Sequence, residues 1–108
     1  MNTVELAKEY FSAFMNKEIQ KLESMYDIGV TLTDWEGSWT GRENVVKANQ
    51  ECFDKFTEID VQQGRFYPDG NGVACPVGIA LDDTAINVVD LIEFNKDGKI
   101  MAIVAYKG

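Results

Sequence analysis

The sequence predicts an α+β fold in which three helices pack against a mostly antiparallel β-sheet. Apolar residues recur at helical spacing in three segments of the first half, residues 2–15, 16–26 and 40–56. Beyond residue 58 the helical pattern stops, and β-branched and aromatic runs alternate with turn-forming segments. One more strand is expected before the last helix. At 108 residues the chain is expected to form a single domain, residues 1–108.

The first expected helix spans Asn2–Met15, with Asn2 as its N-cap and Glu5 three residues later. Its apolar stripe contains Tyr10, whose hydroxyl then needs an interior partner or a cavity. A second, shorter helix is expected after an Asn16 cap. The residues expected to face inward from it are Ile19, Leu22, Met25 and Tyr26.

The segment before the third helix predicts a strand over Val30–Trp35 and then, in the letters DWEGSWTG, a loop or a tight hairpin. Thr40-Gly41-Arg42-Glu43 has the pattern of a capping box and opens a helix to about Phe56. On the apolar stripe of that helix stands Asn49. Its amide is expected either to be hydrogen-bonded in the core or to line a pocket.

Four antiparallel strands are expected in the second half, over Ile59–Tyr67, Val73–Leu81, Ala85–Phe94 and Lys99–Tyr106. Gly64 suggests a bulge in the first strand, and Pro76, which lacks an N–H donor, predicts an irregularity or a free edge in the second. Tight turns between these strands would place Val77 and Ile103 opposite Asp90, and Met101 opposite Ile92.

Asp90 lies on one strand face with Ile86, Val88, Ile92 and Phe94. A carboxyl group among aliphatic side chains has to be paired, hydrogen-bonded or neutral, because desolvation disfavours its ionised form. One interpretation is a purely structural acceptor. The other is a carboxylic acid held neutral for a functional purpose.

Composition excludes several function classes. The formal charge of −8, from 18 acidic and 10 basic residues, disfavours binding to nucleic acid or to anionic membranes. No apolar run approaches the length of a membrane span, and the N-terminus lacks the pattern of a secretory signal. With no histidine, serine–histidine and cysteine–histidine catalysis and imidazole metal ligands are excluded.

The remaining polar clusters favour neither a metal nor a disulfide. Asp82-Asp83 and Asp69–Gly72 lack the spacing of an EF-hand and are interpreted as turns, and neither a metal nor a cofactor is expected. Cys52 and Cys75 lie among apolar residues, which favours free thiols in a reducing compartment. A cytoplasmic location is the expectation.

These residues together resemble the nuclear transport factor 2-like superfamily, in its ketosteroid-isomerase and SnoaL-like branch, over nearly the whole chain. Tyr10 in YFSAF matches the family's oxyanion tyrosine, Asp34 in TDWEG its general base, and Asp90 in VDLIEFN its protonated second oxyanion donor. Tyr26 matches a supporting tyrosine of some members, whereas Asn49 stands nearest to a position where the family has a further tyrosine. The resemblance implies a cone-shaped fold with a curved sheet.

The expected chemistry is removal of a proton next to a carbonyl group, which needs a carboxylate base and donors for the enolate oxygen. Asp34 beside a polar loop can stay ionised, while Asp90 should have a raised pKa; ketosteroid isomerase is the known example of this division. The resemblance makes Asp34, Tyr10 and Asp90 the catalytic candidates. Candidate residues for binding a flat apolar substrate are Phe14, Tyr26, Trp35, Trp39, Asn49, Phe53, Phe66, Val77, Val88, Met101 and Ile103.

Three function classes follow from this pattern. The first is an isomerase or related lyase that acts on a small cyclic or conjugated carbonyl compound, and the second is a SnoaL-like cyclase. The third is a non-catalytic ligand-binding or dimerisation domain. An apolar sheet face carrying Val89, Leu91, Ala102, Val104 and Tyr106, directed away from the pocket, predicts a homodimer through that face.

Overall fold

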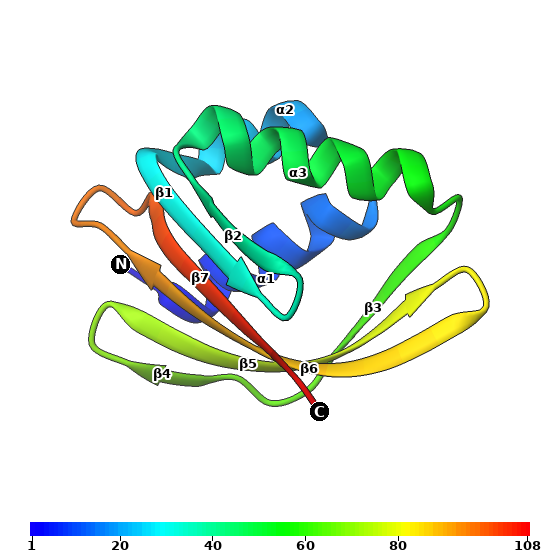
Figure 1. Cartoon of the computed structure of the whole chain (residues 1–108). Helices are drawn as coiled ribbons and strands as arrows, with labels where there is room; N and C mark the ends of the chain where they lie inside the picture. The colour runs from blue at the N-terminus through cyan, green and yellow to red at the C-terminus, as the bar shows by residue number, and fades with distance from the viewer.

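The computed structural model describes all of residues 1–108 and has three helices on the concave side of a bent seven-stranded sheet (Figure 1). The helices are α1 (Thr3–Met15), α2 (Ile19–Met25) and α3 (Arg42–Lys55). The strands are β1 (Tyr26–Asp34), β2 (Gly37–Thr40), β3 (Ile59–Gln63), β4 (Tyr67–Asp69), β5 (Gly72–Leu81), β6 (Thr84–Phe94) and β7 (Ile100–Lys107). The predicted α+β class, with helices on one face of a mostly antiparallel sheet, is confirmed.

The sheet has the strand order β2-β1-β7-β6-β5-β3, with β4 also paired to β5. Every pairing is antiparallel except that of β1 with β7, which is parallel. This parallel pair joins the strand that precedes α3 to the last strand of the chain. The letters DWEGSWTG form the β1–β2 hairpin, one of the two forms expected from the sequence.

The helix ends agree with the sequence in one place and differ in three. Asn2 caps α1 as predicted, its Oδ1 accepting a hydrogen bond from the Glu5 backbone at 3.1 Å. The predicted Thr40 capping box of α3 is wrong: Thr40 belongs to β2, and Gly41 with a φ of 92° is the N-cap. Asn16 ends α1 rather than beginning α2, and Tyr26 is the first residue of β1.

The strand predicted over Ile59–Tyr67 is divided into β3 and β4, which pair with successive parts of β5. At the break, Gly64 donates a backbone hydrogen bond to the Pro76 carbonyl oxygen at 2.9 Å. A Cβ atom on Gly64 would lie 2.9 Å from that same oxygen, so the close approach requires glycine. The irregularity expected at Pro76 is confirmed, because its missing donor coincides with the end of β3.

The cross-strand register differs from the one predicted. The two-residue β5–β6 turn lies one residue earlier than predicted, with Leu81 rather than Asp82 before it, so Cys75 rather than Val77 lies opposite Asp90. On the other side Ala105 lies opposite Asp90, and Ile103 opposite Ile92. An irregularity between Glu93 and Phe94 shifts the β6–β7 register and leaves Met101 directed outward. The shifts by two residues preserve which face each side chain occupies, whereas the bulge does not.

The main core lies between the helices and the concave sheet face. It contains 20 buried apolar residues, among them Phe11, Leu22, Tyr26, Ile92 and Phe94. The opposite face of the sheet carries no helix (Figure 1). No helix of the chain is both long enough and apolar enough to cross a membrane.

Candidate functional site

A cavity of about 470 Å³ lies between the concave sheet face and helices α1 and α3. Its wall combines one polar group from each of four elements: Tyr10 of α1, Asp34 of β1, Asn49 of α3 and Asp90 of β6. Most of the other lining residues are apolar or aromatic: Phe14, Leu32, Trp35, Trp39, Ala48, Cys52, Phe56, Ile79, Leu81, Ile86, Val88, Ile103 and Ala105. A pocket of this kind is typical of a small-molecule site.

Asp90 is positioned by the two-residue alternation of β6. Every second residue from Val88 to Phe94 is buried, which brings Asp90 to the concave face with 6% of its surface exposed. None of the hydrogen bonds within the protein involves its carboxyl group, and Cys75 and Ala105 are its cross-strand neighbours. Burial, together with the smaller effect of the negative charge of Asp34, raises the pKa of Asp90 from 3.8 to about 7. At neutral pH Asp90 is therefore protonated in a large fraction of molecules.

Asp34 ends β1 and forms part of the β1–β2 hairpin. Its Oδ1 accepts backbone hydrogen bonds from Glu36 at 2.7 Å and Gly37 at 3.2 Å, which fixes the side chain at the rim of the cavity. Its Oδ2 is not engaged in these bonds. The two carboxyl groups thus differ in environment: Asp90 is buried among aliphatic groups, whereas Asp34 is half-buried beside a polar turn.

Strand order places these two carboxyl groups at the same level of the sheet. Thr33, the residue before Asp34, pairs with Val104 of β7, and the next residue, Ala105, pairs with Asp90. Strands lie about 4.8 Å apart, so two strand spacings separate the backbones of Asp34 and Asp90 by roughly 10 Å. That separation leaves room for a planar ligand between the two side chains.

Tyr10 and Asn49 line the inner end of the cavity, and Tyr26 lies behind them. Tyr26, only 1% exposed, donates its hydroxyl proton to Asn49 Oδ1 at 2.6 Å. Tyr10, 5% exposed, lies beside Tyr26 with the ring centroids 6.5 Å apart. The pKa of Tyr10 is well above its ordinary value of 10.0, mainly because of burial and also because of Tyr26 and Asp90. Tyr10 is therefore a neutral hydroxyl group that can donate.

The structure brings together nine of the fourteen site residues named from the sequence. The three catalytic candidates all line the cavity, and so do six of the binding candidates: Phe14, Trp35, Trp39, Asn49, Val88 and Ile103.

The other five binding candidates do not line the cavity. Tyr26 lies behind it, hydrogen-bonded to Asn49. Phe53 packs on Phe14 at 5.2 Å and Phe66 on Phe11 at 5.7 Å between ring centroids, while Val77 is a core residue with 4% of its surface exposed. Met101, 39% exposed, lies on the outer face because of the β-bulge.

Several lining residues were not named from the sequence. Ile79 and Ile86 follow the same alternation as Val77 and Val88, so their inward direction was visible in the pattern. Lys55 and Lys107 gave no such signal, because exposed lysines at the ends of elements look alike in sequence. They lie at the mouth, where Lys107 Nζ is 5.6 Å from the centroid of the Trp35 ring. Nowhere in the chain do three or more His, Cys, Asp or Glu side chains gather as metal ligands.

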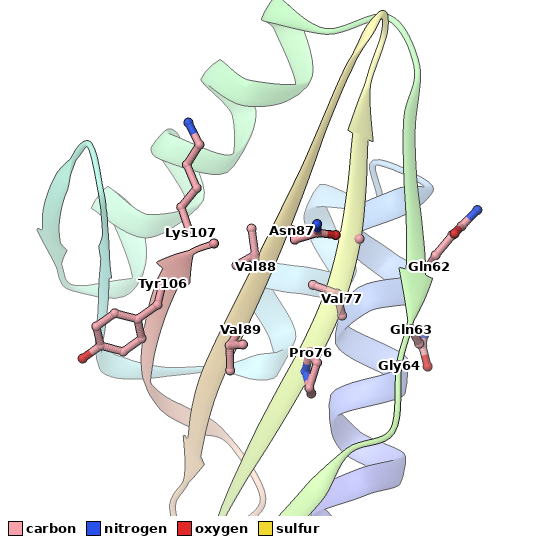
Figure 2. A pocket seen from close by; sticks show the side chains of 12 residues that line it. Gln62, Gln63, Gly64, Pro76, Val77, Asn87, Val88, Val89, Tyr106 and Lys107 are labelled. Atoms are coloured by element: carbon pink, nitrogen blue, oxygen red, sulfur yellow. The ribbon is translucent and has the colours of Figure 1, made fainter.

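A second hollow of about 610 Å³ lies on the outer face, over β3, β5, β6 and the end of β7 (Figure 2). Figure 2 shows Pro76, Val89 and Tyr106 around it, on three neighbouring strands. Lys107 and Tyr106 are its only titratable side chains, and no Asp or Glu side chain lines it. The candidate acid–base residues therefore line the inner cavity and not the outer hollow.

Comparisons with known proteins show a family and a fold. The sequence matches the family model of the SnoaL-like domain over residues 7–103. A protein from Kribbella flavida, provisionally named a ketosteroid isomerase, superimposes with a TM-score of 0.86 at 21% identity, over 98% of this chain and 77% of that one. A SnoaL-like protein of unknown function from Burkholderia thailandensis superimposes with a TM-score of 0.88 at 14% identity, over 98% of this chain and 94% of that one.

A third similar structure, from Shewanella putrefaciens, is provisionally named a SnoaL-like polyketide cyclase. It superimposes with a TM-score of 0.87 at 16% identity, over 99% of this chain and 80% of that one. At these identities the likeness demonstrates the fold alone. No curated protein matched the sequence.

Proposed function

This chain belongs to the SnoaL-like domain family of the nuclear transport factor 2-like superfamily, and from that premise we propose that it moves a proton next to a carbonyl group. The reaction needs no cofactor, because the chain's own acids and hydroxyl supply both the base and the donors. The proposed substrate is a small apolar molecule, cyclic or conjugated, that fits a cavity of about 470 Å³ lined mainly by apolar groups.

In the proposed mechanism Asp34 is the base. Its free Oδ2 accepts the proton from the carbon next to the carbonyl group, while Oδ1 stays bonded to the hairpin backbone. The negative charge that develops on the carbonyl oxygen is stabilised by hydrogen bonds from Tyr10 and the protonated Asp90. Asp34 then returns the proton to a different carbon of the enolate, which completes an isomerisation without net change in protons.

The observation that carries this proposal is the contrast between the two carboxyl groups in one cavity. Asp90 is buried with a pKa raised to about 7, and the charge of Asp34 contributes to that rise. Asp90 is therefore suited to donate a hydrogen bond as a neutral acid, whereas Asp34, held by the hairpin backbone at the rim, has a free oxygen suited to accept a proton. A structural acceptor would instead be surrounded by donors, and Asp90 has none within the protein.

A SnoaL-like cyclase is the second candidate, and the Shewanella putrefaciens structure favours it through its name. Closure of a ring by an aldol-type step needs the same carboxylate base and the same donors for the enolate oxygen. The two candidates differ in what the enolate attacks: a proton on Asp34 in the isomerase, or a second carbonyl carbon of the substrate in the cyclase.

The test follows exchange of hydrogen for deuterium at the acidic carbon of cyclic enones by NMR, in the parent and in Asp34→Asn. Loss of the base should slow exchange by about 10²- to 10⁴-fold. Asp69→Asn, an exposed acid on β4 that is not part of the cavity wall, makes the same chemical change and should keep the parent rate.

Phenols separate binding from catalysis in the same proteins. A phenol places its oxygen where the enolate oxygen forms, so Asp34→Asn should bind it at least as well as the parent does, because one negative charge has been removed. Exchange that is no faster in the parent than in Asp34→Asn, across a broad panel of enones, contradicts the catalytic proposal. Phenol binding without exchange would then leave a ligand-binding domain.

We also propose a homodimer through the outer sheet face, where Val89, Leu91, Met101 and Tyr106 are 37–60% exposed without a covering helix. Figure 2 shows Val89 and Tyr106 on neighbouring strands of this face. An apolar patch on an acidic chain of charge −8 is best covered by an equally uncharged patch, which a second copy supplies. Sedimentation at micromolar concentration should show a dimer that Tyr106→Asp dissociates; a parent that sediments as a monomer refutes it.

A cytoplasmic location is proposed from the thiols. Cys52 and Cys75 are both free, and burial raises the pKa of Cys75 to about 12, so this thiol stays protonated. Free thiols are typical of a reducing compartment.

A further inference from the structure

The deepest polar groups of the cavity are three side chains that are each more than nine-tenths buried. Tyr10, Asn49 and Asp90 expose 5%, 4% and 6% of their surface. The remaining lining side chains that carry a charge, such as Glu36 and Lys55 at the mouth, are half-buried or exposed. Polar recognition of a ligand inside the cavity therefore depends on these three groups, and the proposed mechanism uses only two of them.

The side-chain amide of Asn49 has one half engaged and the other half free. Its Oδ1 accepts the Tyr26 hydroxyl proton at 2.6 Å, which directs the NH₂ group away from Tyr26. No hydrogen bond within the protein involves Nδ2. Every side-chain nitrogen or oxygen atom that is sealed from solvent has a hydrogen-bond partner. Because Asn49 is 4% exposed and lines the cavity, Nδ2 reaches the cavity surface as an unpaired donor.

We propose that the Asn49 amide nitrogen is a specificity-determining donor that binds a second oxygen atom of the substrate. The inference rests on the proposed function, in which Tyr10 and Asp90 bind the reacting carbonyl oxygen. The substrate class is thereby narrowed to conjugated carbonyl compounds that carry a further acceptor, as a second carbonyl, hydroxyl or ether oxygen. A ligand without this oxygen would cover a buried N–H donor and leave it unpaired, which is unfavourable.

Tyr26 acts as the positioning residue for this donor. Rotation of the amide by 180° would present Oδ1 to the cavity and place Nδ2 against the Tyr26 hydroxyl. The Tyr26 proton favours the observed orientation because it needs an acceptor, and Tyr26 is 1% exposed with no route to solvent. The cavity therefore presents a donor to the ligand at this place, and prefers ligands with an acceptor there over ligands with a donor.

The test measures binding of phenol and of its three methoxy isomers by titration calorimetry to the parent, Asn49→Asp and Asn49→Leu. Phenol contacts Tyr10 and Asp90 alone, and the ether oxygen of one isomer should reach Asn49. The parent should bind that isomer about 3- to 10-fold more tightly than phenol, the usual range for one neutral hydrogen bond. Asn49→Asp keeps an oxygen for Tyr26 but has no side-chain N–H, and Asn49→Leu has neither. The preference for the methoxy isomer should therefore vanish in both variants.

Two results overturn the inference: no methoxy isomer is preferred over phenol by the parent, or the preference persists in Asn49→Asp. Either means that Asn49 serves Tyr26 alone, or that water satisfies its amide. The readout is binding and needs no turnover. Methoxy preference that is lost in both variants, together with absent proton exchange, would overturn the proposed function and leave this inference standing.

Discussion

The clearest consequence of the structure is that Asp90 should make the protein less stable as the pH rises. In the unfolded chain its carboxyl group ionises near its ordinary pKa of 3.8, whereas in the folded protein it keeps its proton up to about pH 7. Between these values the folded state binds one more proton than the unfolded state. The stabilisation is therefore fully present below pH 3.8 and is lost as the pH rises through 7.

The size of the effect follows from the two pKa values. A difference of about three pH units, at about 1.4 kcal/mol for each, amounts to about 4 kcal/mol. Small domains unfold with total free energies of only about 5–15 kcal/mol. The loss is therefore large enough to be measured directly.

The assay is urea unfolding, followed by circular dichroism at a fixed protein concentration, for the parent and Asp90→Asn between pH 4 and 8.5. Asparagine keeps the shape of the neutral acid and does not titrate. The free energy of unfolding of the parent minus that of the variant should fall by about 4 kcal/mol over this range. Other titrating groups cancel in the difference. Asp90→Asn should then be the more stable protein at pH 8.

A difference that stays constant with pH would show that Asp90 does not hold a proton in the folded state. A difference that rises with pH would show an ionised carboxylate held by donors, and the assignment of Asp90 as a neutral donor would be wrong. Asp69→Asn is the control, because it makes the same chemical change at an exposed position outside the cavity.

Three further predictions concern catalysis and packing. Proton exchange catalysed by the parent should decrease above about pH 7 in a pH–rate profile, because ionised Asp90 can no longer donate to the enolate oxygen; a rate that stays level to pH 9 would contradict this role. Gly64→Ala should lower the free energy of unfolding in urea by about 1–3 kcal/mol, since its Cβ would lie 2.9 Å from the Pro76 carbonyl oxygen. Gly78→Ala, whose Cβ would meet nothing nearer than 3.9 Å, should change this free energy little. Lys17→Met should lower the melting temperature by removing hydrogen bonds of 2.9 and 2.5 Å from Lys17 Nζ to two carbonyl oxygens at the end of α3; an unchanged melting temperature would mean that solvent replaces them at no cost.

Patterns of neighbouring residues determined much of this protein from the sequence alone. The helical stripe of the first segment placed Tyr10 inward, and the alternation around Asp90 placed a carboxyl group among aliphatic side chains. Both are consequences of a short local period, 3.6 residues in a helix and two in a strand, and need no knowledge of the partner. The raised pKa of Asp90 follows from that placement.

Tertiary structure alone decided how these elements meet. The parallel pairing of β1 with β7 brings Asp34 to the level of Asp90, although 55 residues separate them in the sequence. The bulge at Glu93 turned Met101 outward. The bond from Tyr26 to Asn49 oriented an amide that the sequence left open between core and pocket. Strand pairing, register and side-chain partners arise from contacts distant in the chain, so their physical determinants are spread over many residues and no local pattern contains them.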